Sequence, residues 1–218
     1  MLRIALDGPG GTGKSTVAKA VAARYGIDYV DTGAMYRAVA LKTVRKGLAD
    51  DDEASIANML KDTSIDFNGT SIILDGEDVS GLIRTNEISM KASNVSKLGP
   101  VREFVSSYSR YLASTKDLIM DGRDIGTNVI TDAEVKIFMT ASPEVRGMRR
   151  YKQLLEAGKE ADLEQITKEI AERDYQDSHR ELNPLRPADD AIVLDTSDMD
   201  LDANIDAVCE IIDRVAKR

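Results

Sequence analysis

The sequence predicts an α/β fold: a P-loop NTPase-type parallel sheet flanked by helices, with a small antiparallel insertion. Three observations support this prediction. Short apolar stretches alternate with amphipathic stretches of helical length along most of the 218 residues. A glycine-rich segment over 8–16 joins the first expected strand to the first expected helix. Turn residues within 62–94 interrupt the alternation.

The first elements follow from apolar spacing and cap residues. A strand over 2–7 leads through the glycine-rich segment to a helix over 13–25, and a second short strand covers 27–31. Asp31 and Thr32 then predict the start of a helix. The acidic run at 50–52 predicts the start of the next helix, because carboxylates favour helix N-termini.

The middle of the chain changes character. Strand-like residues at 64–67 and 71–76 flank Asn68-Gly69, a dipeptide typical of a hairpin turn. Residues 78–83 predict a third short strand, and helical patterning returns over 86–96 and 100–113. We therefore expect an inserted subdomain over about 62–94.

The second half returns to alternating strands and helices. The expected strands are 118–120, 135–139 and 191–195. Ser142-Pro143 predicts a helix start, since proline fits the first helical position. That helix ends near Gly158, and the remaining helices are expected over 163–180 and 201–215. Ligands of such a sheet bind at the carboxyl ends of its strands.

Composition limits the class of protein. The chain is 42% hydrophobic and has a net charge of −9, so it is a poor candidate for bulk binding to nucleic acid or acidic membranes. No apolar run is long enough to span a bilayer, and the N-terminus lacks a secretory pattern. The single cysteine, Cys209, lies among apolar residues and predicts a small core side chain. We expect a cytoplasmic monomer.

The segment after the first strand matches the phosphate-binding P-loop pattern G-x-x-x-x-G-K-S. Glycines let backbone N–H groups approach phosphate oxygens, Lys14 adds a positive charge, and Ser15 offers a hydroxyl to Mg²⁺. Asp121, at the end of a later strand, is a candidate to hold Mg²⁺ through water, or else to cap the following turn. The predicted ATP-binding residues are Gly8, Pro9, Gly10, Gly11, Thr12, Gly13, Lys14, Ser15 and Thr16.

Arginines indicate the chemistry of the acceptor. An acceptor phosphate is already nucleophilic at neutral pH, so it needs positive charge more than a general base. Several arginines fall where the fold places loops at strand ends or on neighbouring helices: Arg37, Arg123, Arg146, Arg149, Arg150, Arg173 and Arg180. Asp177 shares a helix face with Arg173 and Arg180, so an exposed ion-pair ladder is the alternative there. The only histidine, His179, is expected to be a solvated helix residue.

Five segments together resemble the bacterial cytidylate kinases. The resemblance rests on Gly8–Thr16, Asp31–Arg37, Gly76–Ser80 with Ile83–Thr85, Asp121–Thr127, and Glu172–Asp174 through Arg180, in order along almost the whole chain. It implies transfer of the γ-phosphoryl group of ATP to CMP or dCMP, with Mg²⁺. It also implies a single kinase domain with a core over 1–61, 95–145 and 163–218, a monophosphate-binding insert over about 62–94 and a lid over about 146–162.

The resemblance also implies roles for individual residues. Ser93, Arg102 and Asp124 would contact cytosine, whose amino group and ring acceptors complement a carboxylate and a guanidinium. Arg37, Arg123 and Arg180 would bind the CMP phosphate, with Arg173 and Asp177 nearer the sugar. Thr32 stands where some members have serine, and completes the expected CMP-binding set. The residues expected to act in catalysis are Lys14, Arg123, Arg149 and Arg180.

Two alternatives remain open at this point. One is a kinase for another small acceptor, such as shikimate or a different nucleoside monophosphate. The other is a GTP-dependent switch, which would need an Asn-Lys-x-Asp-type guanine reader that the sequence does not show after its core strands. The region around Thr196-Ser197 is a candidate for adenine contacts.

Overall fold

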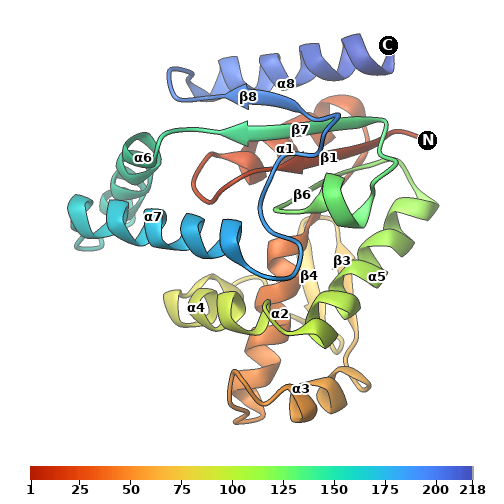
Figure 1. The fold of residues 1–218 in the computed structure, drawn as a ribbon, viewed down its shortest axis with the longest axis vertical. Coiled ribbons are helices and arrows are strands. Elements are labelled where there is room, and N and C mark those ends of the chain that lie inside the picture. The colour runs from red at the N-terminus through yellow and green to blue at the C-terminus, as the bar shows by residue number, and fades with distance from the viewer. Residues whose placement is uncertain (218) are drawn as a thin grey trace. The chain divides into compact units, whose positions relative to one another are not determined.

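A computed structural model of the chain describes residues 1–217 (Figure 1). The chain forms two compact units. Unit 1 combines Met1–Ile27 with the chain from Asp117 onward, and unit 2 is Asp28–Lys116. Unit 2 contains the whole of the expected insert.

Unit 1 is built on parallel strands. β6 (Leu118–Gly122), β1 (Arg3–Asp7), β7 (Val135–Thr140) and β8 (Ile192–Asp195) lie side by side in this order. Their inward side chains are aliphatic and buried, among them Ile4, Leu6, Ile119, Ile137 and Met139. Each such side chain stabilises the fold by about 1.5–3 kcal/mol relative to exposure, so these strands form the core of the unit.

Helices pack against these strands. α1 (Lys14–Tyr25) packs on β1 and β6, and α8 (Leu201–Ala216) packs on α1 and β7, as Figure 1 shows at the blue end of the chain. Cys209 is buried in α8, as the sequence predicted. The register pairs Asp7 with both Gly122 and Phe138, so the carboxyl ends of β1, β6 and β7 meet at one edge.

Two long helices, α6 (Pro143–Glu156) and α7 (Leu163–His179), lie side by side in unit 1 (Figure 1). The predicted start of α6 is confirmed: the Ser142 hydroxyl accepts a hydrogen bond from Val145 N, and Pro143 opens the helix. The break near Gly158 is also confirmed, since this glycine has a left-handed φ of 69° just after α6. His179 is exposed as the last residue of α7.

Unit 2 begins with β2 (Asp28–Asp31) and α2 (Thr32–Arg45), followed by α3 (Glu53–Leu60). A three-stranded antiparallel sheet follows, with order β3 (Ile65–Asn68), β4 (Ser71–Leu74) and β5 (Glu77–Asp78). α4 (Asn86–Val95) and α5 (Gly99–Thr115) complete the unit. The predicted hairpin at Asn68-Gly69 is therefore confirmed.

The predicted third strand over 78–83 is wrong beyond Asp78. Strand pairing ends there, and Leu82–Arg84 forms a 3₁₀ turn. Val79 and Ile83 are both buried, and Ile83 N donates to Val79 O. Residues four positions apart share a face in a strand as well as in a helical turn, so burial alone does not separate the two. The bonds of Leu82 N and Ile83 N to Val79 O close a helical turn in place of further strand pairing.

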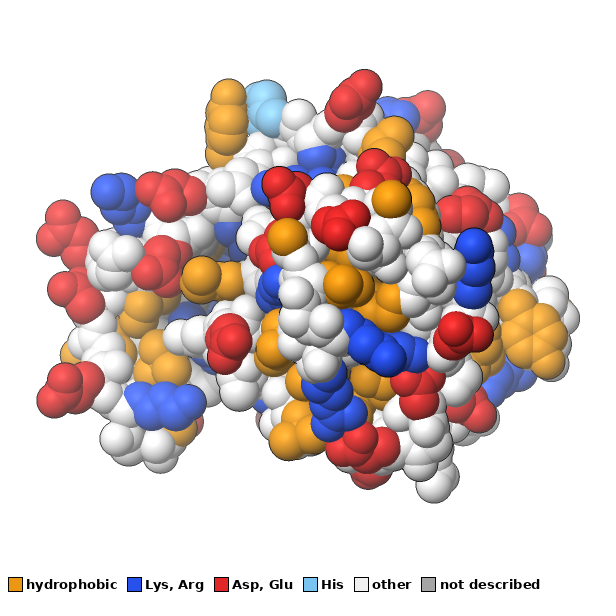
Figure 2. Space-filling view, turned by 90° about the horizontal axis from the view of Figure 1, so that it is seen from below, with side chains coloured by type: hydrophobic (Ala, Val, Ile, Leu, Met, Phe, Trp, Pro, Cys, Tyr) orange, Lys and Arg blue, Asp and Glu red, His pale blue; other side chains and the backbone are white. Residues whose placement is uncertain are grey.

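The surface is mixed in charge. Figure 2 shows acidic and basic side chains interspersed on the face that it draws, rather than one basic field. Within residues 1–217, no helix combines the length and the apolar composition that a bilayer crossing requires.

Candidate active site

The phosphate loop begins where β1 ends. Gly8 has φ 142°, and a Cβ there would lie 1.9 Å from the carbonyl oxygen of Met139. Only glycine fits this position. Gly13, with φ 90°, precedes α1 and offers no side-chain cap to the helix. The first N–H groups of α1 are therefore suited to bind an anion.

Lys14 is buried within this loop. Its ammonium donates hydrogen bonds to Pro9 O at 2.6 Å and to Thr12 Oγ1 at 3.3 Å. Burial and, to a smaller extent, the positive charge of Arg123 lower the pKa of Lys14 to about 7, against the opposing effect of Asp121. An incoming polyphosphate would favour the charged amine.

Ser15 and Asp121 meet beside the loop. The Ser15 hydroxyl donates to Asp121 Oδ2 at 2.6 Å, from α1 to β6. A hydroxyl and a carboxylate are hard oxygen ligands of the kind that Mg²⁺ prefers. No group of three or more His, Cys, Asp or Glu side chains within residues 1–217 is arranged to hold a metal. Beside nucleotides, Mg²⁺ is usually bound by one or two protein oxygens together with phosphate and water oxygens.

Alternating charges link Asp121–Asp124, here named the DGRD segment, to the C-terminal end of α7. Arg123 Nε donates to Asp177 Oδ2 at 3.1 Å, and Arg180 NH2 lies 3.2 Å from Asp124 Oδ1. Asp177 also lies 4.0 Å from Arg180, so it stands between the two arginines. Arg123 reaches the phosphate loop as well, since a Cβ on Gly10 would lie 3.3 Å from its NH2. Arg123 and Arg180, both expected to bind the CMP phosphate, are thus held close together by the carboxylates of Asp124 and Asp177.

Arg146 and Arg149, two of the three arginines predicted on the helix that begins at Pro143, both make hydrogen bonds to other segments of unit 1. Arg146 is buried; it donates to Ala141 O and Gly10 O, and forms a two-bond ion pair with Asp174 of α7. Arg149 donates to Thr196 O at 2.6 Å and to Met199 O at 3.1 Å. In this structure Arg149 therefore contacts the β8–α8 connection. Arg150 and Arg173 are exposed.

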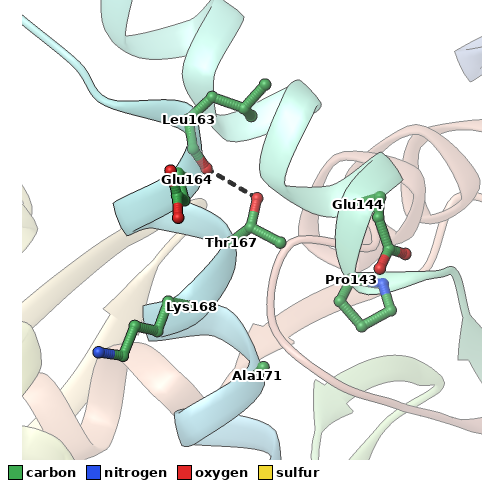
Figure 3. Close-up of a pocket in the computed structure, with 7 residues that line it drawn as sticks. All are labelled: Pro143, Glu144, Leu163, Glu164, Thr167, Lys168 and Ala171. Atoms are coloured by element: carbon green, nitrogen blue, oxygen red, sulfur yellow. Dashed lines mark hydrogen bonds between the residues drawn. The ribbon is translucent and has the colours of Figure 1, made fainter.

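A shallow groove of about 540 Å³ separates the start of α6 from the first half of α7 (Figure 3). The surface that lines the groove is mainly apolar. The Thr167 hydroxyl donates a hydrogen bond to Leu163 O of the same helix at 2.7 Å. The residues around it include Pro143, Glu144, Leu163, Glu164, Thr167 and Lys168. None of the predicted site residues lines it.

Unit 2 contains the other expected CMP-binding residues. The Arg37 guanidinium pairs with Asp31 at 3.0 Å, while its Nε is buried without a hydrogen-bond partner in the described residues. Such a buried donor is costly unless a ligand accepts from it. Thr32, the first residue of α2, is buried.

Arg102 and Ser93 lie at the junction of α4 and α5. Arg102 is buried, and its NH1 donates to Ser96 O at 3.2 Å. Its guanidinium lies over the Tyr36 ring, 5.9 Å from the ring centre. Ser93, whose carbonyl accepts from Ser96 Oγ, is half-buried. No motif predicted the contact of Tyr36 with Arg102. The position of Tyr36 directly before Arg37, a predicted CMP-binding residue, could have indicated that Tyr36 lies in the same region.

The comparisons with known proteins agree with this arrangement. A sequence model of the family described as cytidylate kinase matches residues 4–215. The cytidylate kinase of Chlorobaculum tepidum is 43% identical over 221 residues, covering 99% of this chain and 94% of that protein. The cytidylate kinase of Streptococcus thermophilus is 46% identical over 222 residues, covering 100% of this chain and 96% of that protein.

Among solved structures, the shikimate kinase from Bacteroides thetaiotaomicron aligns with a TM-score of 0.52 at 11% identity, covering 100% of this chain and 99% of that one. A likeness at this level of identity supports the fold alone. The family model and the full-length relatives go further: this chain belongs to the cytidylate kinase family.

Proposed function

We propose that this protein transfers the γ-phosphoryl group of ATP to CMP, and to dCMP, giving ADP and CDP or dCDP. The observation that carries the proposal is the set of Arg123, Asp177, Arg180 and Asp124 beside the phosphate loop. Two anionic substrates must be brought end to end, and arginines held next to a P-loop reduce their repulsion. The reaction places the enzyme in pyrimidine nucleotide metabolism.

The proposed donor side consists of the loop Gly8–Thr16. Backbone N–H groups and the Lys14 ammonium hold the β and γ phosphates of ATP. Ser15 would hold Mg²⁺ directly and Asp121 would hold it through water, and the bound ion would supply positive charge beside the phosphates. The segment 146–162 serves as a lid, and the segment near Thr196-Ser197 contacts adenine.

The proposed acceptor side needs no general base. The phosphate of CMP is largely a dianion at neutral pH, so its oxygen attacks the γ-phosphorus without prior loss of a proton. Arg37, Arg123 and Arg180 bind this phosphate. When CMP arrives, Arg180 exchanges part of its ion pairing with Asp124 and Asp177 for phosphate oxygens. Arg149 supports catalysis from the start of the lid.

We assign the selection of cytosine over uracil to hydrogen bonds between the base and the protein. Asp124 accepts from the cytosine amino group, while Arg102 donates to its ring acceptors and Ser93 assists. Uracil presents a carbonyl where cytosine has its amino group, so the Asp124 carboxylate would face an oxygen. Arg173, Asp177 and Thr32 complete the CMP-binding set. The protein is proposed to act as a cytoplasmic monomer with no nucleic-acid or membrane partner.

An acceptor panel tests the function. Purified protein with ATP and Mg²⁺ is given CMP, dCMP, UMP, AMP or GMP, and ADP formation is measured together with the diphosphate product. We expect kcat/KM for CMP to exceed that for UMP by roughly 10³–10⁴, the discrimination reached when a site hydrogen-bonds its substrate. A sample without acceptor controls for ATP hydrolysis. Equal turnover of all five acceptors would refute the cytosine assignment.

A further inference from the structure

Asp7 is a buried carboxylate that the proposed reaction does not use. It is the last residue of β1 and only 5% exposed. Its Oδ1 accepts from Ile125 N and its Oδ2 accepts from Gly126 N, each at 2.8 Å. These two N–H groups belong to the residues that directly follow Arg123 and Asp124. A core strand thus binds, through one side chain, the backbone of the DGRD segment.

We propose that Asp7 is a positioning residue for base recognition, whose carboxylate fixes the backbone that presents Arg123 and Asp124. The inference rests on the proposed role of Asp124 in reading cytosine. Asp7 itself touches no substrate in this scheme. It acts on the placement of the carboxylate that does.

The geometry leaves this segment little freedom. Asp124 has φ −144° and ψ 30°, outside regular structure, and Ile125–Val129 forms a single π-helical turn. Gly126 lies between Asp7 and the stem of Lys136. A Cβ on Gly126 would approach Lys136 Cδ to 3.2 Å and Asp7 Oδ2 to 3.4 Å. The two hydrogen bonds and this close packing together define where Asp124 lies.

The charge state of Asp7 suits this role. Burial, with a smaller contribution from the repulsion of Asp124, raises the pKa of Asp7 to about 6. The N–H groups of Gly126 and Ile125 and the positive charge of Lys14 oppose it. The group is therefore mostly a carboxylate at pH 7.5, and a carboxylate can accept from two N–H donors with both oxygens.

The hydrogen bonds of the Asp7 side chain go to Ile125 and Gly126, and its link to the phosphate loop is the attraction of its charge for Lys14. Gly8 is placed by its own conformation and by its close approach to the Met139 carbonyl of β7. Loss of the Asp7 carboxylate should thus disturb the base-reading segment more than ATP binding. A recognition site loses selectivity when its groups move by about 0.5 Å.

The test is Asp7→Asn. The amide keeps the shape but offers one acceptor oxygen and turns an NH₂ group toward a backbone donor. At pH 7.5 we expect KM for CMP to rise at least ten-fold, and the ratio of kcat/KM for CMP over UMP to fall at least ten-fold. The Kd for ATP without acceptor, measured by calorimetry, should change less than three-fold. Asp132→Asn, at an exposed carboxylate in the connection to β7, is the matched control and should leave all three values unchanged.

Gly126→Ala is a second variant, which leaves β1 unchanged. If Asp7→Asn fails to fold, Gly126→Ala tests whether the position of this segment controls the preference for CMP. The added methyl group requires a shift of a few tenths of an ångström between the segment and the Lys136 side chain. The Lys136 ammonium is bonded to Thr131 O and Asp190, so we expect the segment to take part of that shift, with the same loss of selectivity and retained ATP binding. A variant that keeps the CMP preference of the wild type would overturn the inference, as would an equal loss of ATP and CMP binding. A wild type without CMP preference would instead overturn the proposed function, and the inference with it.

Discussion

Lys14 shows how one residue is prepared for an anion. Its amine is surrounded by the loop itself, bonded to Pro9 O and Thr12 Oγ1, with Arg123 as a nearby positive charge. Burial and that repulsion disfavour the ammonium, which brings the pKa of Lys14 to about 7. A bound triphosphate supplies the negative charge that the loop lacks, and so raises the pKa again.

This leads to a prediction about protons. At pH 8 most Lys14 amines are neutral without nucleotide, so ATP binding should take up about one proton. Calorimetry in two buffers of different ionisation enthalpy measures the uptake as a difference in observed enthalpy. In Lys14→Arg the charge is permanent, so that variant should show no such difference. Identical enthalpies for the wild type in both buffers would contradict the prediction.

At the scale of elements, Arg146 joins three segments of unit 1. From α6 it reaches Gly10 O in the phosphate loop, Ala141 O at the end of β7, and both oxygens of Asp174 on α7. The Arg146 side chain is 3% exposed and that of Asp174 is 23% exposed. A buried guanidinium without its carboxylate is strongly destabilising.

Asp174→Asn should therefore lower the free energy of unfolding by about 3 kcal/mol, because it leaves the Arg146 charge buried with only carbonyl partners. KM for ATP should also rise, since Arg146 contacts the phosphate loop. Urea unfolding measures the first effect and initial rates the second. The matched control is Glu164→Gln, an exposed carboxylate on the same helix, which is expected to change stability by less than about 0.5 kcal/mol. If both variants unfold at the same urea concentration, the ion pair does not stabilise the unit.

The elements that the sequence predicted well are those with local signals. Ser142, Asp52 and Asp31 all cap helices as predicted, and Asn68-Gly69 turns the hairpin. The strand predicted over 78–83 failed beyond Asp78 because the burial of Val79 and Ile83 fits a strand and a helical turn equally, and backbone bonds to Val79 O select the turn. The turn over Ile125–Val129 was missed for a related reason. Its first N–H groups are satisfied by Asp7, more than a hundred residues earlier.

At the scale of the whole molecule, motifs predicted which residues lie near one another in unit 1 better than they predicted individual contacts. Lys14, Ser15, Asp121, Arg123 and Arg180 lie near one another in unit 1, in agreement with the sequence analysis. Motif spacing does not reveal that Arg149 turns to the carbonyls of Thr196 and Met199, since α6 and the β8–α8 connection are distant in the sequence. The role of Asp174 was hidden in the same way.

Binding of nucleotide to the whole chain gives the last prediction. A ligand at a hundred times its Kd stabilises the folded state by about 2.7 kcal/mol. For a chain of this size that corresponds to a rise in Tm of roughly 5–10 °C. We expect ATP with Mg²⁺ to produce such a shift, CMP to add to it, and GTP to produce a clearly smaller one at equal concentration. Thermal denaturation followed by fluorescence dye or circular dichroism measures all three. A larger shift with GTP than with ATP would favour a guanine-nucleotide switch, because the size of the shift at equal concentration reports which nucleotide binds more tightly.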